Sequence, residues 1–77
     1  MSNLENGTEM IGTVRNFDAK KGYGFIKARG VDEDIFVHHR TLEGEGYRNL
    51  YRGDNVSFKL YQNGDKGLIA RNVRVIP

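Results

Sequence analysis

Residues 21–28 read Lys-Gly-Tyr-Gly-Phe-Ile-Lys-Ala, and their alternation gives the clearest indication of the fold. Successive side chains of a β-strand point to opposite faces, so alternation with a period of two predicts a strand over 23–28. One face would carry two rings and a cation and the other only small or aliphatic groups: Tyr23, Phe25 and Lys27 against Gly24, Ile26 and Ala28. Gly22 suits the positive φ of a tight turn before that strand. The stretch therefore predicts a turn and a strand buried on one side.

The same alternation recurs on both sides of this stretch. It predicts further strands near 10–17, 34–38, 55–61 and 67–75, separated by turns at 18–22, 30–33 and 63–65. The inward positions are all hydrophobic: Val14, Ile26, Ile35, Val37, Val56, Phe58, Leu60 and Val73. Two open sheets of this length would leave exposed edges, whereas closure of the strands into a barrel removes them. We therefore expect an all-β, five-stranded antiparallel barrel.

The length and composition limit the domain organisation and the cellular setting. Seventy-seven residues suffice for one domain, which we place at 10–77 after a polar, mobile leader at 1–9. The chain has no cysteine, no signal-peptide pattern and no apolar run near the ~20 residues that cross a bilayer. We expect a soluble cytoplasmic protein. A monomer is expected, although the long connection His39–Asp54 leaves a strand-swapped dimer open.

The outward positions carry the functional signal. Tyr23, Phe25 and Phe36 alternate out of phase with the aliphatic core, where a plain barrel would expose lysine, threonine or glutamate. Residues 15–30 also hold five cationic side chains against one acidic side chain. Exposed rings in a basic surround suit a polyanion that also has flat faces. Unpaired bases would stack on the rings, while Arg15, Lys21 and Lys27 would neutralise phosphates. This predicts binding of single-stranded RNA or DNA.

Two motifs resemble those of the cold-shock domain family. Gly12–Phe17 leads into Lys21-Gly-Tyr-Gly-Phe-Ile26, which is similar to the first ribonucleoprotein motif of that family, and Asp34-Ile-Phe-Val-His-His39 is similar to the second. The order of Gly44–Tyr47, Val56–Phe58 and Ala70–Val73 follows the same pattern. The resemblance spans about 10–75. It implies an oligonucleotide-binding (OB-fold) barrel, single-strand binding, and roles as an RNA chaperone or a regulator of transcription or translation.

The resemblance also implies roles for individual residues. Stacking falls on Phe17, Tyr23, Phe25, Phe36, His38 and Tyr47, a backbone contact on Lys21, and a hydrogen bond to a base edge on Asp34. His39 stands where phenylalanine is usual, and its imidazole can still stack. With Arg15, Lys27 and Arg71 these residues complete the candidate binding site, and pyrimidine-rich strands are its candidate ligands. Asn16 replaces a usual tryptophan, Asp18 a usual asparagine and Leu68 a common proline.

Other functions find less support in the sequence. A small SH3-like barrel that binds peptides stays open as an alternative, and a ribosome-associated barrel like translation initiation factor one would lack the paired motifs. No nucleophile stands in a catalytic pattern, so we expect neither an enzyme nor a cofactor. His38 and His39 are adjacent in a predicted strand and should point to opposite faces, which disfavours a shared metal ion. Asp32-Glu33-Asp34 lacks the spacing of a calcium loop and fits an acidic turn.

Overall fold

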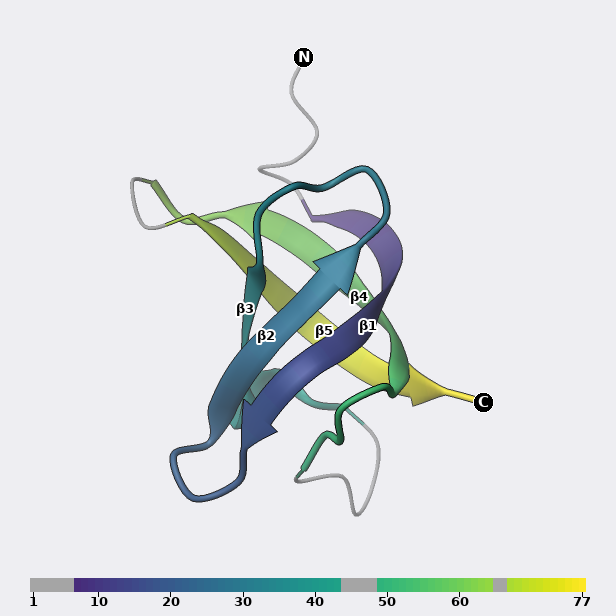
Figure 1. Cartoon of the computed structure of the whole chain (residues 1–77). Coiled ribbons are helices and arrows are strands. Elements are labelled where there is room, and N and C mark those ends of the chain that lie inside the picture. Colours follow the sequence, from purple (N-terminus) through teal and green to yellow (C-terminus); the bar gives the residue numbers. More distant parts are fainter. Residues whose placement is uncertain (1–6, 44–48, 65–66) are drawn as a thin grey trace.

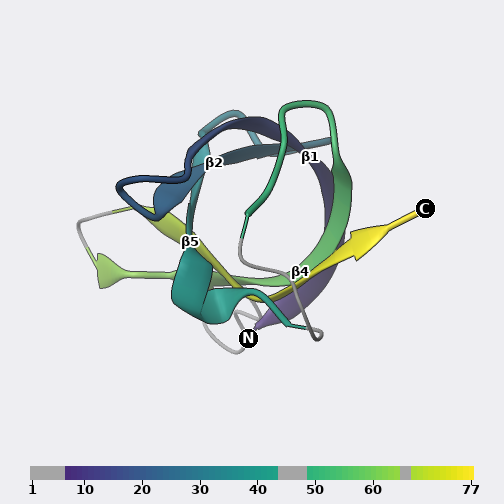
Figure 2. The same cartoon turned by 90° about the horizontal axis from the view of Figure 1, so that it is seen from below.

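The computed structural model describes residues 7–43, 49–64 and 67–77. These residues form five strands, β1 (Thr8–Asp18), β2 (Tyr23–Ala28), β3 (Ile35–His38), β4 (Asn55–Gln62) and β5 (Leu68–Ile76), with a short 3-10 helix η2 (His39–Thr41) after β3. The strands close into a barrel in the order β1-β2-β3-β5-β4 (Figure 1). Viewed from below, they surround a single interior (Figure 2). The predicted all-β barrel is confirmed.

Most neighbouring strands pair antiparallel, but β3 and β5 run parallel, with Phe36 opposite Ile69. The expectation of a wholly antiparallel sheet is therefore wrong at this ladder. The chain after β3 passes through η2 to β4, and β4 and β5 then form a hairpin that returns beside β3. A parallel contact needs such a long crossover, which the 39–54 connection supplies.

The strand limits differ from expectation by at most two residues. β1 begins at Thr8 rather than near Met10, so the strand includes two residues that the sequence had assigned to a leader. The strand β2 has the expected limits, β3 begins one residue later at Ile35, β4 extends one residue farther, and β5 is shifted by one residue at both ends. Residues 1–6 lie outside the described residues. Within the described ranges, no helix is long and apolar enough to cross a membrane.

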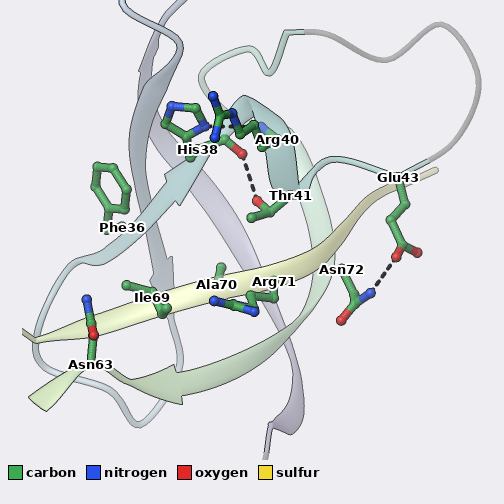
Figure 3. Close-up of a pocket in the computed structure, with 10 residues that line it drawn as sticks. All are labelled: Phe36, His38, Arg40, Thr41, Glu43, Asn63, Ile69, Ala70, Arg71 and Asn72. Atoms are coloured by element: carbon green, nitrogen blue, oxygen red, sulfur yellow. Dashed lines mark hydrogen bonds between the residues drawn. The ribbon is translucent and has the colours of Figure 1, made fainter.

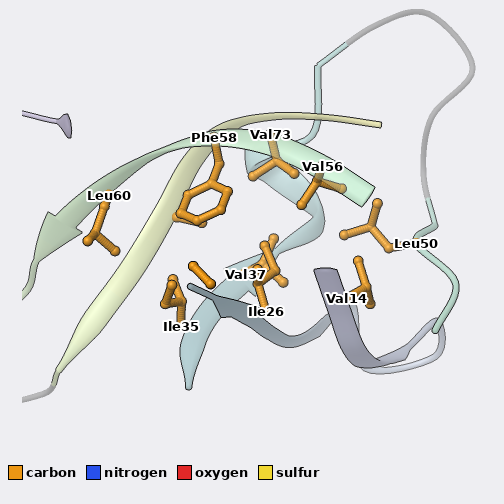
Figure 4. Packing of buried hydrophobic residues seen from close by; sticks show 11 residues of the cluster. Val14, Ile26, Ile35, Val37, Leu50, Val56, Phe58, Leu60 and Val73 are labelled. Atoms are coloured by element: carbon orange, nitrogen blue, oxygen red, sulfur yellow. The ribbon is translucent and has the colours of Figure 1, made fainter. Parts of the chain in front are cut away.

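The barrel interior contains every predicted core residue. All eight are at most 1% exposed, and Leu50, Ala28 and Ala70 complete the cluster (Figure 4). No polar or charged residue among those described is buried with them. Leu50 reaches the core because its connection is fixed to β1: Gly53 N donates to Val14 O, and Val14 N donates to Asp54 O, both at 2.9 Å. The core thus fills the barrel and leaves the outer surface of each strand available.

Candidate nucleic-acid interface

Four rings stand on the outer surface of β2 and β3, and we call Tyr23, Phe25, Phe36 and His38 the aromatic face. Tyr23 lies opposite His38, and Phe25 lies opposite Phe36, in the antiparallel register. The ring centre of Phe36 is 5.6 Å from Tyr23, 6.0 Å from Phe25 and 6.4 Å from His38. These are contact distances for aromatic pairs. The rings support one another on one side and stay partly open to solvent on the other.

The His38 and His39 rings lie together, so the expectation that they point to opposite faces is wrong. The strand β3 ends at His38 and η2 begins at His39, which ends the two-residue alternation. The two ring centres are 4.4 Å apart and tilted by 33°. The backbone N–H of Arg40 donates to Nδ1 of His38 at 3.2 Å. Loss of hydration, followed by the charges of His39 and Arg40, lowers the pKa of His38, which favours a neutral ring.

Gly22 makes room for the His39 ring. The backbone N–H of His39 donates to the carbonyl of Gly22 at 2.8 Å. A Cβ at position 22 would lie 2.5 Å from Cδ2 of His39, and the φ of Gly22 is +81°. Because side chains rarely adopt this φ, glycine serves both the turn and the ring that lies across it. His39 thereby extends the aromatic face toward the β1–β2 turn.

At that turn, side chains of β1 and β2 line a shallow hollow. Its lining residues are Asn16, Phe17, Asp18, Ala19, Lys20, Lys21, Tyr23, Gly24 and Phe25. Phe17 lines this hollow but is half-buried and also packs against the core. The carboxylate of Asp18 accepts hydrogen bonds from the backbone N–H groups of Lys20 and Lys21, at 2.9 and 3.1 Å. The turn thus uses the side chain at position 18 only as a hydrogen-bond acceptor. Lys21 stays exposed at the rim of the hollow.

A second group of charges borders the aromatic face near the end of β2. A β-bulge between Val14 and Asn16 leaves Arg15 without an opposite residue on β2. Arg15 forms an ion pair with Asp34 at 3.2 Å, and Nζ of Lys27 lies 3.7 Å from the same carboxylate. The Asp34 carboxylate is therefore within ion-pair distance of two cations. All three side chains are more than one-third exposed, so this pairing is readily exchanged for another partner.

On the other side of Phe36, a hollow opens toward β5 (Figure 3). It is lined by Phe36, His38, Arg40, Thr41, Glu43, Asn63, Ile69, Ala70, Arg71 and Asn72. At its far wall, Glu43 accepts hydrogen bonds from the Asn72 side chain and, at 3.4 Å, from Nε of Arg74. The bond from Asn72 and the nearby Arg74 lower the pKa of Glu43, against a smaller opposing effect of burial. This contact fixes the end of the segment after η2 to β5.

The structure brings most of the predicted site residues onto one surface. Tyr23, Phe25, Phe36, His38 and His39 form a continuous ring cluster, and Arg15, Lys27 and Asp34 border it. Phe17 and Lys21 line the hollow at the adjoining β1–β2 turn, and Arg71 of β5 lines the other hollow, beside Phe36. Tyr47 lies outside the described residues. Arg40 and Ile69 also line the hollow beside Phe36, and the sequence analysis did not place them there. Local alternation reveals neither the crossover after β3 nor the parallel β3–β5 ladder.

Comparisons with known proteins identify the family of this chain. The model of the 'Cold-shock' DNA-binding domain matches residues 10–76, which is most of the chain. The chain belongs to the cold-shock domain family. It is 47% identical over 66 residues to the cold shock-like protein CspA of Stigmatella aurantiaca, covering 86% of this chain and 96% of that protein. It is 43% identical over 76 residues to the major cold shock protein CspA of Pseudomonas aeruginosa, covering 99% and 100%.

A solved structure, drosophila Unr CSD456, matches this cold-shock domain with a TM-score of 0.76. The match covers 92% of this chain but only 28% of that chain, at 20% sequence identity, and so supports the fold alone. The predicted family and OB-fold barrel are confirmed by these comparisons. Cold-shock domains are a nucleic-acid-binding, non-enzymatic family, which places this chain among small nucleic-acid-binding proteins.

Proposed function

We propose that this cold-shock domain binds single-stranded RNA or DNA by laying unpaired bases on the aromatic face. The observation that carries the proposal is that the Tyr23 and Phe25 rings of β2 each lie within 6.0 Å of the Phe36 ring of β3 on the outside of the barrel. A base that is free of its own partner offers a flat face to such rings, whereas bases in a duplex are stacked and paired already. The ligand is therefore a single strand.

The charges around the rings support a polyanionic ligand. Lys21 is exposed at the β1–β2 turn, and Arg15 and Lys27 border the other side of the rings. Phosphates reaching Arg15 and Lys27 would compete with Asp34, whose carboxylate then becomes available to hydrogen-bond a base edge. Neutralising phosphates releases counterions from the nucleic acid, so affinity should fall as salt rises.

Stacking also sets the breadth of sequences that the protein would accept. Every base has a π-face, so rings tolerate many sequences, and any preference for pyrimidine-rich strands would follow from stacking strength and backbone flexibility. Broad binding to unpaired strands suits an RNA chaperone that keeps transcripts open, or a regulator of transcription or translation. With transcripts as targets, the proposed place of action is the cytoplasm and the proposed active form is the monomer.

The test is a titration of a fluorescently labelled pyrimidine-rich oligonucleotide, free and annealed to its complement, each at two salt concentrations. We expect the single strand to bind much more tightly than the duplex, and both affinities to fall with salt. A labelled proline-rich peptide is the control for an SH3-like function, and it should not bind. Equal affinity for single strand and duplex would leave only a basic patch and reject stacking.

A further inference from the structure

A continuous row of directly paired residues crosses all five strands. Asn16 of β1 is opposite Phe25 of β2, which is opposite Phe36 of β3. Phe36 is in turn opposite Ile69 of β5, and Ile69 is opposite Tyr61 of β4. None of the five is buried, so the row runs over the outside of the barrel. The aromatic face therefore continues past Phe36, across an aliphatic residue, to a further ring.

The far end of this row combines a ring with cations. The guanidinium carbon of Arg71 lies 5.5 Å from the centre of the Tyr61 ring, and Lys59 is opposite Arg71 in the β4–β5 ladder. Among the described residues, neither Lys59 nor Arg71 forms a salt bridge. Arg71 also lines the hollow that begins at Phe36 and His38 (Figure 3). A guanidinium plane held over a ring accepts a base by stacking as well as a phosphate by charge.

We propose that Tyr61 and Arg71, with Lys59 beside them, form an additional nucleotide subsite on β4 and β5. A single strand stacked on the aromatic face would pass Ile69, place a further base against the Tyr61–Arg71 pair, and bring its phosphate to Lys59. Neighbouring strands lie ~4.8 Å apart, so Tyr61 is about 10 Å from Phe36 along the row. The inference rests on the proposed single-strand function and adds a separate part to the binding path.

A length series of oligothymidylates, lengthened one nucleotide at a time, tests this subsite. Wild-type affinity should rise with length until the last subsite is filled. The affinity of the Arg71→Ala variant should stop rising at a shorter oligothymidylate length than that of the wild type. The same should hold for the double variant that carries both Tyr61→Ala and Arg71→Ala. Affinity for long strands should fall at least about fivefold, while short strands bind as before. Arg71→Lys keeps the charge without the planar group and should recover only part of the loss.

Two controls separate the possible outcomes. Arg52→Ala removes the same charge from an exposed turn outside the row and should keep the wild-type plateau length. Because Arg71 is exposed, the Arg71→Ala variant should fold normally. This single variant therefore tests the subsite even if loss of the half-buried Tyr61 ring lowers the melting temperature of the double variant. An unchanged length profile in Arg71→Ala would overturn the subsite and leave the proposed function standing. If no wild-type single strand binds at any length, the proposed function itself fails.

Discussion

The two faces of β2 and β3 carry hydrophobic groups of different kinds in different surroundings. Facing inward, Ile26, Ile35 and Val37 are all 0% exposed. Facing outward on the same strands, Phe25 and Phe36 are half-buried and Tyr23 is 36% exposed. The aliphatic side is closed by β4 and β5, whereas the aromatic side is covered by no other described element. One pair of strands thus provides both a core and an open apolar surface.

This contrast separates stability from function. Burial of the aliphatic side chains supplies the hydrophobic free energy that holds a domain without disulfides together. The rings outside gain only part of that energy and keep an apolar patch in water, which is a liability unless a ligand covers it. The rings also contact one another, so removing one weakens its neighbours. Substitutions inside should therefore change mainly the free energy of unfolding, and those outside mainly the affinity.

The largest effect should come from the interior. Phe58 is 1% exposed and is among the largest buried side chains. Phe58→Ala should cost ~3–5 kcal/mol of stability, most of what a domain this small possesses. Urea or thermal unfolding followed by circular dichroism measures the loss. A variant that melts near wild type would mean that the core is not continuous through Phe58. Gln62→Ala, on the exposed end of the same strand, is the control and should melt as wild type.

Local alternation was enough to predict the inside of the barrel. Residues such as Ile35, Val37 and Phe58 are assigned to the inner face because the residues two positions away are also hydrophobic, and barrel closure then buries them. The rings of the aromatic face follow from the same rule. Both predictions depend only on the pleat of a strand, which is a local property.

What alternation missed depends on contacts between distant segments. The parallel β3–β5 ladder puts Ile69 beside Phe36, and the sequence around either residue does not predict this pairing. The bulge at Arg15 arises from the register between two strands. The position of the His39 ring depends on the start of η2 and on the bare backbone of Gly22. Alternation with the buried Leu60 puts Tyr61 on the outside, but its place in the row depends on the registers of the three ladders that join β2, β3, β5 and β4.

A smaller effect should come from adding a ring to the outer face. Asn16 is exposed and lies opposite Phe25, where directly paired side chains are about 5 Å apart at Cβ. Asn16→Trp should add a stacking platform and tighten binding of a pyrimidine-rich single strand by at least about fivefold. Thermal stability should change little. Fluorescence titration beside Asn16→Leu, which adds apolar surface without a ring, isolates stacking; equal gains in both variants would contradict it.

The smallest effect concerns the Glu43 contact with Asn72 and Arg74, away from both faces. The folded protein lowers the pKa of Glu43 below the ordinary 4.5, so the folded state favours the carboxylate. Its stabilisation is present above the unfolded pKa and is lost as pH falls through the lower folded value. Glu43→Gln should therefore lower the melting temperature slightly at neutral pH and make no difference in strong acid. Melts across that range measure it, and a pH-independent difference would reject the electrostatic origin.

The most direct test compares neighbours on one strand, Phe36 outside and Val37 inside. Val37→Ala removes buried volume and should cost roughly 2 kcal/mol of stability, while the folded fraction binds a single strand with wild-type affinity. Phe36→Ala should reduce the affinity of the folded protein about tenfold or more, because the ring at the centre of the aromatic face is lost. Melts fix the folded fraction for each titration. Wild-type affinity in folded Phe36→Ala would contradict binding by stacking on the aromatic face.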